Sequence, residues 1–346
     1  MIKVDALLKA GSPEEIDLEI RFLEKYGFSG AWTFEAKNDP FLPLSFAIRS
    51  SNKINLGTNI TVAFARTPFA LAQTAWDLQK FSRGRFNLGL GTQVKSHIER
   101  RYSVQFDKPA ARIEEYIRCI KSIWDCFQTG KQPDFDGHFY KFSLLTDFFN
   151  PGPIKWPRIP IYLAGVNPLM CEVAGKVADG FHVHPMHTVE FLKDMVIPNV
   201  NKGLISSEEP ERNFELYAPI FVITGETYEE KLGMERVVRQ QIAFYGSTPN
   251  YAVLFQYHGY PDLGKKLNLS LKRGELDTMG DLIPDELLEK IVIIDNPENL
   301  AQRIIDRYLG VLNRFSVYSF LDDEQSLESF KNLPSEIINI LAVNKN

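Results

Sequence analysis

Short apolar runs alternate along the chain with segments whose apolar residues fall on one helical face. The first apolar run covers residues 2–7, and Ile16, Ile20 and Leu23 follow it at helical spacing. Spacings of three and four residues indicate an amphipathic helix, whereas a short continuous apolar run between turn signals indicates a buried strand. The start of the chain therefore predicts one strand followed by one helix.

The same unit of strand and helix recurs to the end of the chain. Its helices begin at recognisable caps, because Ser12, Thr67 and Asn167 each precede a proline that suits the first helical turn. Eight such alternations are typical of an α/β fold of the (β/α)8 TIM barrel type. The predicted strands cover residues 2–7, 30–34, 54–62, 87–93, 159–164, 180–184, 216–223 and 315–320.

Two long segments interrupt this repeat, as insertions after strands 4 and 7. Residues 94–157 are too many for a simple crossover and contain a helix of their own, with Ile113, Ile117 and Trp124 on one face. Residues 246–285 are polar and aromatic, and we expect them to cover the mouth of the barrel. Since no repeat, low-complexity run or flexible linker divides the chain, the sequence predicts a single domain over residues 1–346.

Composition and charge argue against nucleic acid and membranes as binding partners. The 346 residues carry a formal net charge of -5 with no basic stripe of the kind that binds a phosphate backbone. No stretch of the sequence is apolar enough to span a bilayer. Cys119, Cys126 and Cys171 form no C-x-x-C pair and cannot all pair with one another, which favours a reducing compartment. We expect a cytoplasmic protein with no nucleic-acid and no membrane partner.

The fourth predicted strand is the most informative stretch, because it runs directly into small residues. A helix ends at Gly84, the chain turns, and the strand at residues 87–93 follows. Gly89 and Gly91 allow a flat ligand to approach the backbone closely. A lone G-x-G pattern is more often a plain turn than a cofactor loop, since a dinucleotide fold needs a fuller glycine fingerprint. Whether this G-x-G pattern marks a turn or a cofactor loop therefore depends on the other motifs in the chain.

Those surroundings match a known family over nearly the whole chain. The sequence resembles the bacterial-luciferase-like superfamily, and in particular its branch of oxidoreductases that depend on the deazaflavin coenzyme F420. The resemblance implies a barrel, usually an oligomer such as a homodimer, that binds flavin mononucleotide (FMN) or the deazaflavin where its strands end. The stretches that carry it are Gly57-Thr58-Asn59-Ile60 through Thr67-Pro68, Ser82-Arg83-Gly84-Arg85-Phe86, Leu88-Gly89-Leu90-Gly91-Thr92, Pro160-Ile161-Tyr162-Leu163-Ala164-Gly165, Ala174-Gly175 and Ala178-Asp179-Gly180.

The resemblance implies a place for the cofactor ring. Family members hold the ring against a bulge with a non-proline cis peptide at the end of strand three, which falls here at Asn59 and Ile60. From the residues alone, an ordinary strand would be the interpretation. The loop after strand four, with Gly91, Thr92 and Gln93, and His184 at the end of strand six are the further ring contacts that the resemblance implies.

The turn after strand five is a candidate phosphate site. Asn167 caps a helix that begins at Pro168, and the free amides of a first helical turn face any anion in front of them. An ordinary capped helix is the alternative from the residues alone. The resemblance places the cofactor phosphate in this loop, at Gly165, Val166 and Asn167.

Polar residues after strands two, four and six are the candidates for chemistry. We select His97 as a proton donor, since the unperturbed pKa of histidine lies near neutrality, and Glu35 and Asp39 as further catalytic candidates. Some deazaflavin dehydrogenases keep a catalytic histidine after strand two, and its position corresponds to Asn38 or Asp39 here. This departure argues against a sugar-phosphate dehydrogenase. Other polar residues in these loops are Glu99 and His187.

A zinc hydrolase is a rival interpretation of the pair His182 and His184. Histidines at alternate strand positions face the same way and can ligate zinc. Such a site needs further histidine and carboxylate ligands from other strands, and the chain has 6 histidines with no matching H-x-H after its first strand. We therefore expect no metal.

The expected activity is hydride transfer between coenzyme F420 and a small organic substrate. The deazaflavin carries carbon where flavin has its reactive nitrogen, so it favours hydride transfer and does not readily activate oxygen. Lys95, Arg100 and Arg101 could meet its anionic tail, although such side chains are commonly just solvated. The first alternative is a monooxygenase that uses FMN and oxygen, and the second is a barrel that binds flavin without turnover.

Overall fold

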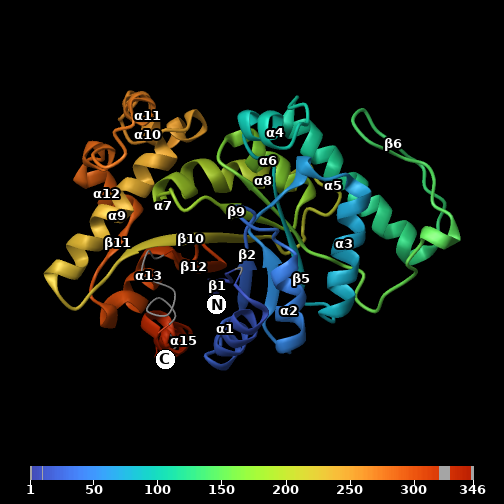
Figure 1. Ribbon diagram of the computed structural model, residues 1–346, viewed down its shortest axis with the longest axis horizontal. Coiled ribbons are helices and arrows are strands. Elements are labelled where there is room, and N and C mark those ends of the chain that lie inside the picture. The colour runs from blue at the N-terminus through green and yellow to red at the C-terminus, as the bar shows by residue number, and fades with distance from the viewer. Residues whose placement is uncertain (1, 10, 319–327, 344–346) are drawn as a thin grey trace.

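The barrel strands form a closed parallel ring. The computed structural model describes residues 2–9, 11–318 and 328–343. Within these residues, the last barrel strand pairs with the first and with its predecessor, which closes the ring and confirms the (β/α)8 prediction (Figure 1). The ring contains β1 (Lys3–Leu7), β2 (Gly30–Thr33), β3 (Asn55–Thr58), β5 (Phe86–Gly91), β8 (Ile161–Gly165), β9 (Gly180–Val183), β10 (Glu215–Ile223) and β12 (Arg314–Tyr318).

The predicted strand boundaries hold to within one or two residues, with one exception at strand three. An unbroken strand over residues 54–62 is wrong, because the chain forms β3, then a cis peptide between Asn59 and Ile60, then the short strand β4 (Thr61–Val62). Both pieces pair with β5 on either side of the break. The cis bond lies where the resemblance implied it. Phe320, the predicted end of strand eight, lies outside the described residues.

Helices surround the ring, and several begin at the predicted caps. The Ser12 hydroxyl accepts from the Glu15 amide at 3.2 Å, while the Glu15 carboxylate accepts from the Ser12 amide at 2.6 Å. Among the described residues, no helix combines the length and the apolar character that crossing a membrane requires. The surrounding helices include α1 (Pro13–Lys25), α2 (Leu42–Ser50), α3 (Pro68–Phe81), α6 (Pro168–Val177), α8 (Ile197–Ile205) and α13 (Leu300–Tyr308).

Both predicted insertions are present, after β5 and after β10. In Figure 1, α4 and the pair α10 and α11 lie at the same upper edge of the molecule. The face of α5 that carries Ile113, Ile117 and Trp124 is buried, as its spacing predicted. The first insertion contains α4 (Lys95–Arg101), α5 (Pro109–Thr129), β6 (Phe135–Asp136), β7 (Lys141–Phe142) and η2 (Asp147–Phe149). The segment after β10 contains α9 (Tyr228–Gly246), η4 (Pro249–Tyr251), α10 (Ala252–Tyr257), α11 (Leu263–Arg273), η5 (Met279–Leu282), α12 (Asp285–Ile291), β11 (Ile293–Ile294) and η6 (Pro297–Asn299).

The lower half of the barrel interior is filled by a buried ion pair and an aromatic cluster. Arg314 donates from Nε and Nη2 to the two carboxylate oxygens of Asp5 at 2.7 and 2.9 Å, and the Trp32 indole donates to Asp5 at 2.8 Å. Above this pair, at the floor of the mouth, Trp32, Tyr162 and Tyr217 surround the ring of His182, with centroids 5.0 to 5.1 Å away. This aromatic cluster separates the mouth of the barrel from its opposite end.

Candidate active site

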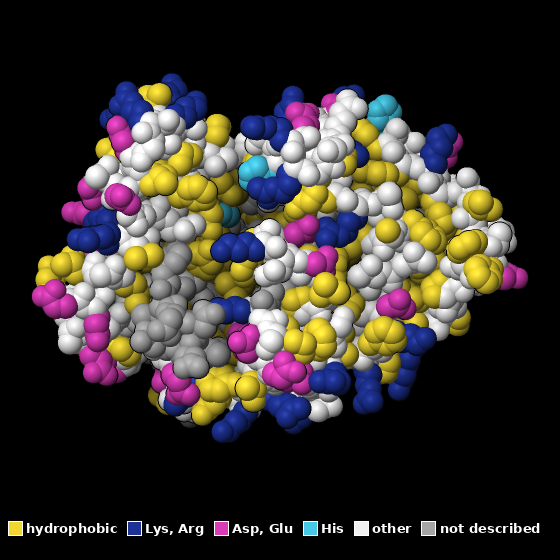
Figure 2. All heavy atoms as spheres, in the orientation of Figure 1, with side chains coloured by type: hydrophobic (Ala, Val, Ile, Leu, Met, Phe, Trp, Pro, Cys, Tyr) yellow, Lys and Arg dark blue, Asp and Glu magenta, His cyan; other side chains and the backbone are white. Residues whose placement is uncertain are grey.

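A pocket of about 230 Å³ opens where the barrel strands end. Active sites of (β/α)8 barrels lie at this face, because the loops after the strands converge there. Figure 2 shows histidine, lysine and arginine side chains gathered around a hollow near the centre of the visible face. The pocket walls come from the ends of several barrel strands and from α9, and they include Asn59, Ile60, Ala164, His182, His184, Pro219, Tyr245 and Tyr318.

The glycines of β5 fit the backbone and side chains of the bulge. A Cβ added at Gly89 would lie 1.7 Å from the carbonyl oxygen of Thr58, and one at Gly91 would lie 2.8 Å from Cδ1 of Ile60. The small residues thus hold β5 against the bulge that forms one wall of the pocket. Beyond them, Gln93 has a positive φ of 58°, and its side-chain oxygen accepts from the Val94 amide at 3.2 Å.

The candidate phosphate loop is capped as predicted, with fewer free amides than expected. The Asn167 side chain accepts from the Met170 amide at 2.9 Å, and Pro168 has no N–H. Donors for an anion must therefore come from the other amides of the turn, near the half-buried Val166. A Cβ at Gly165 would lie 2.3 Å from Cγ of Met170, so even alanine at this position requires the helix or the side chain to move.

His184 lines the pocket as a neutral imidazole that can donate one hydrogen bond. Its Nδ1 accepts from the Met186 amide at 3.1 Å, so the ring proton lies on Nε2. Desolvation, with a smaller contribution from His187, lowers the pKa of His184 to about 3. The imidazole packs against the rings of Tyr245 and Tyr251, with centroids 4.6 and 4.4 Å away.

His182 is the buried polar group beneath the pocket. It is 2% exposed, and neither ring nitrogen has a hydrogen-bond partner among the described residues. Burial lowers its pKa to about 3, against a smaller opposing contribution from a contact with the Thr58 backbone that does not have hydrogen-bond geometry. A buried polar group without a partner is costly, so His182 suits a site where a bound ligand supplies the missing partner.

Glu35 and Asp39 lie beside the pocket and hold Arg66 between them. Arg66 donates to Glu35 at 2.7 Å and to Asp39 at 3.2 Å. The remaining acceptor sites of Glu35 receive the Val62 amide at 2.8 Å and the Tyr102 hydroxyl at 3.2 Å. Asp39 also accepts from the backbone amides that begin α2. These contacts give both carboxylates a structural function, and their catalytic function stays a prediction.

His97 lies on α4, outside the walls of the 230 Å³ pocket. Its Nδ1 bonds to the side-chain oxygen of Gln93 at 3.1 Å, which leaves Nε2 as an acceptor. Desolvation and the neighbouring Arg101 lower its pKa. The structure therefore links His97 to the glycine loop through Gln93, and proton transfer by this residue stays a prediction.

The sequence did not single out Tyr245 and Tyr318, which face each other at the pocket with their hydroxyl oxygens 2.9 Å apart. Tyr318 ends β12, so the rule that barrel chemistry lies where strands end could have found it. Tyr245 lies at the end of α9, and only the folded chain shows its approach. Tyr251, which the sequence placed in the insertion over the mouth, packs on His184.

The residues fit a flat heteroaromatic group. Ile60, Ala164 and Val183 provide apolar surface, while the unpartnered nitrogens of His182 and the Nε2 proton of His184 can meet the polar edge of such a ring. In the described part of the chain, no three histidine, cysteine, aspartate or glutamate side chains gather as metal ligands would.

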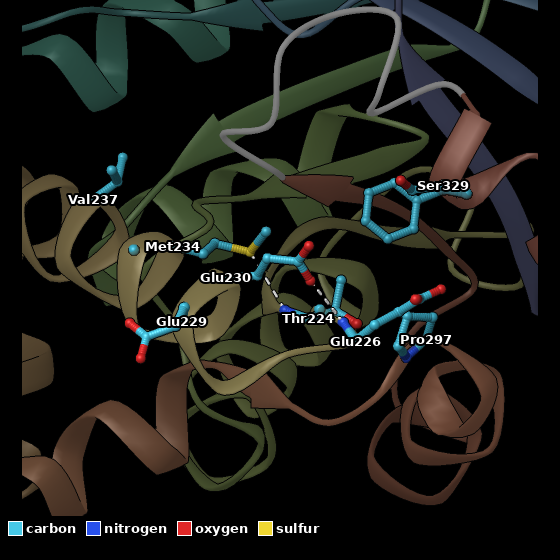
Figure 3. Close-up of a pocket in the computed structure, with 11 residues that line it drawn as sticks. Thr224, Glu226, Glu229, Glu230, Met234, Val237, Pro297 and Ser329 are labelled. Carbon is cyan, nitrogen blue, oxygen red and sulfur yellow. Dashed lines mark hydrogen bonds between the residues drawn. The ribbon is translucent and has the colours of Figure 1, made fainter.

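A larger hollow of about 510 Å³ lies elsewhere, between the start of α9, Pro297 and Phe330 (Figure 3). Glu226, Glu229 and Glu230 line it, and the Glu230 carboxylate already accepts from the Glu226 amide at 2.9 Å. An acidic lining repels a phosphorylated cofactor. The smaller pocket at the barrel mouth is therefore the candidate active site.

Comparison with known proteins identifies relatives over most of the chain. An uncharacterized protein of Mycobacterium tuberculosis (strain ATCC 25618 / H37Rv) is 40% identical, with 84% of this chain and 86% of that protein covered. A 5,10-methylenetetrahydromethanopterin reductase of Archaeoglobus fulgidus is 23% identical, with 84% and 85% covered.

Solved structures share the fold. The coenzyme F420-dependent tetrahydromethanopterin reductase of Methanopyrus kandleri superposes with a TM-score of 0.76 at 18% identity, covering 98% of each chain. A type II Baeyer–Villiger monooxygenase of Pseudomonas putida in complex with FMN gives a TM-score of 0.67 at 14% identity, covering 97% of this chain and 98% of that one. The family model of luciferase-like monooxygenases matches residues 2–313. The chain therefore belongs to the luciferase-like monooxygenase family and is an oxidoreductase.

Proposed function

We propose that the protein transfers a hydride between coenzyme F420 and a small organic substrate at the barrel mouth. The observation that carries the proposal is the pocket whose wall is the cis peptide bulge at Asn59 and Ile60, backed by the glycines of β5. A Mycobacterium tuberculosis relative named as a putative coenzyme F420-dependent oxidoreductase supports the deazaflavin, because it is 27% identical over 81% of this chain.

In this proposal the bound cofactor supplies or accepts the hydride, and the chain binds and orients its parts. Asn59, Ile60 and His184 would contact the ring, together with Gly91, Thr92 and Gln93 on the neighbouring loop. The turn from Gly165 to Asn167 would bind the phosphate, and Lys95, Arg100 and Arg101 on α4 would attract the anionic tail. The exposed positions of these three basic residues suit a flexible tail at the rim.

The second candidate is a monooxygenase that uses FMN and oxygen. It is favoured by the likeness in fold to the Pseudomonas putida monooxygenase in complex with FMN. FMN and the deazaflavin both present a flat ring and a phosphate, so the same pocket could take either. A barrel that binds flavin without turnover is the remaining alternative.

Titration of the purified protein with each oxidised cofactor tests the proposal. We expect saturable quenching of deazaflavin fluorescence, binding weaker by tenfold or more for FMN, and reduction of the bound deazaflavin by an alcohol substrate. Tight FMN binding with no deazaflavin binding would contradict the first candidate. Retention of cofactor without turnover over a broad substrate panel would favour the binding protein.

The cellular setting is part of the same proposal. Cys119, Cys126 and Cys171 are all unpaired and buried, which agrees with a reducing compartment and supports a cytoplasmic location. The family resemblance implies a homodimer. The exposed rings of Phe148 and Phe149 in the first insertion are consistent with it, because exposed apolar side chains can form an interface between subunits. Sedimentation analysis of the purified protein would test the subunit count.

A further inference from the structure

Two phenols meet at the pocket from elements far apart in the sequence. Tyr245 ends α9, Tyr318 ends β12, and their hydroxyl oxygens lie 2.9 Å apart. Both side chains are half-buried and both line the 230 Å³ pocket. We propose that this phenol pair donates the proton that a carbonyl oxygen of the substrate takes up, and that the substrate is an uncharged carbonyl compound. The inference rests on the proposed hydride transfer.

The surroundings orient both phenols and keep that of Tyr318 protonated. Tyr318 packs on the ring of Phe221 at 5.1 Å between centroids, and Tyr245 packs on His184 at 4.6 Å. Desolvation, followed by the neighbouring Tyr245, raises the pKa of Tyr318 well above its usual range. A protonated phenol can give its proton to the strongly basic oxygen that hydride addition to a carbonyl creates, and the aromatic contacts hold each ring in place.

The pairing allows a proton to be given and replaced. In a bonded pair of hydroxyl groups, one oxygen donates to the other, so the two oxygens share two protons. Reduction of a carbonyl adds a hydride at carbon and a proton at oxygen, as the electron pair of the C=O bond moves onto that oxygen. The cofactor supplies the hydride, one phenol gives its proton to the substrate oxygen, and the phenolate left behind takes a proton from its partner, which regains one from water.

The walls of the pocket set the class of substrate. Among the described residues, its lining contains no lysine, arginine, aspartate or glutamate. His182 and His184 also line it, and burial lowers both pKa values to about 3, so these rings are neutral near pH 7. A charged substrate group would lose its hydration here without meeting an opposite charge, which is costly. An uncharged ketone or aldehyde fits, whereas a sugar phosphate or a carboxylate does not.

Removal of each hydroxyl tests the role of the pair. We compare Tyr245→Phe, Tyr318→Phe and the double variant with Tyr228→Phe, which alters a tyrosine that is 75% exposed. With reduced deazaflavin and either cyclohexanone or benzaldehyde, we expect turnover to fall about 100-fold in the double variant and to stay at the parental level in the control. The KM should change much less than kcat, because the proton moves in the transition state.

Two binding measurements separate this role from a structural one. The dissociation constant for oxidised deazaflavin should stay within about threefold of the parent in every variant, since phenylalanine keeps both aromatic walls and the proposed ring contacts at Asn59, Ile60 and His184 remain. Benzamide, an uncharged carbonyl compound that resists reduction, should bind the cofactor-loaded protein about tenfold more weakly when both hydroxyls are absent.

Each possible negative result contradicts a different part of the proposal. Absence of deazaflavin binding in the parent would overturn the proposed function itself. Normal deazaflavin binding, with parental turnover and parental benzamide affinity in the double variant, would overturn the role of the phenols. Turnover of glucose 6-phosphate or pyruvate, with none of the two uncharged compounds, would overturn the substrate class. A double variant that has lost deazaflavin affinity as well would show that the pair only holds α9 against β12.

Discussion

The two halves of the barrel interior differ in whether their buried polar groups have hydrogen-bond partners within the chain. In the lower half, the charges of Asp5 and Arg314 satisfy each other through two hydrogen bonds, and Trp32 donates a third. At the mouth, both nitrogens of His182 lack partners among the described residues. Buried polar groups usually have partners within the chain, so we propose that the open nitrogens of His182 meet a ligand. The proposed contrast is between a stabilising ion pair and a binding site within one barrel.

The largest effect is expected where the ion pair is broken. Arg314→Ala leaves the Asp5 carboxylate buried and unpaired, and we expect it to lower the free energy of unfolding by about 3–5 kcal/mol. Arg49→Ala is the matched control, because the Arg49 side chain is 71% exposed in its pair with Asp17, and it should cost at most about 1 kcal/mol. Denaturant unfolding measures both. Equal losses of unfolding free energy in the two variants would show that the buried ion pair contributes no more to stability than the exposed pair.

A smaller loss of stability, with a loss of cofactor binding, is expected at the border between the two halves. In Gly89→Ala the added methyl group meets the carbonyl oxygen of Thr58, and we expect a loss of about 1–3 kcal/mol together with weaker deazaflavin binding. Gly233→Ala is the control, since its added Cβ on the exposed face of α9 meets no other part of the chain within 4 Å, and it should stabilise by about 0.5–1 kcal/mol. Thermal melting and deazaflavin titration report the two effects. Parental behaviour of Gly89→Ala would contradict the close approach of β3 and β5.

A new negative charge at the rim of the mouth should weaken deazaflavin binding without lowering the stability of the protein. Val166→Asp puts a carboxylate near the proposed phosphate, and Val166→Asn is the uncharged control. Two unit charges about 4 Å apart at an effective dielectric near 20 repel by about 4 kcal/mol, and water at the rim screens most of that, so we expect about tenfold weaker deazaflavin binding. The loss should shrink as salt rises. Equal affinities for the Asp and Asn variants, with parental melting curves, would place the phosphate elsewhere.

The smallest expected effect is a change in the pH dependence of stability. Burial lowers the pKa of His182 and His184 to about 3 and that of His187 to about 4, each below the ordinary histidine value of 6.5. Below pH 6.5 the unfolded chain therefore binds more protons than the folded one, and stability falls as the pH drops toward 4. His182→Phe should reduce this slope by about one bound proton. An unchanged slope between pH 6.5 and 4.5 would mean that His182 titrates normally in the fold.

The sequence predicted those features that depend on local pattern. The strand at residues 216–223, the caps at Ser12 and Asn167, and the buried face of α5 follow from spacing and turn chemistry, and the structure confirms them. The cis peptide at Asn59 came only from the family resemblance, because the residues around it are also compatible with an ordinary strand.

Contacts between distant parts of the chain could not be predicted in this way. Asp5 and Arg314 are 309 residues apart, and nothing in the sequence around either residue indicates that the two form a pair. Tyr245 and Tyr318 are 73 residues apart and meet only because α9 leans over the end of β12. In the same way, Glu35 and Asp39 gave no sign of their common partner Arg66, and the contact between Gly165 and Met170 depends on how α6 packs.

A structure of the protein in complex with oxidised coenzyme F420 tests the function of the mouth most directly. We predict that the deazaflavin ring lies in the 230 Å³ pocket against Ile60, with its polar edge within hydrogen-bond distance of His182 or His184 and its phosphate at the turn that contains Val166. A ring bound in the acidic hollow lined by Glu226 and Glu229, or a ring at the mouth that leaves both histidines without contact, would contradict it.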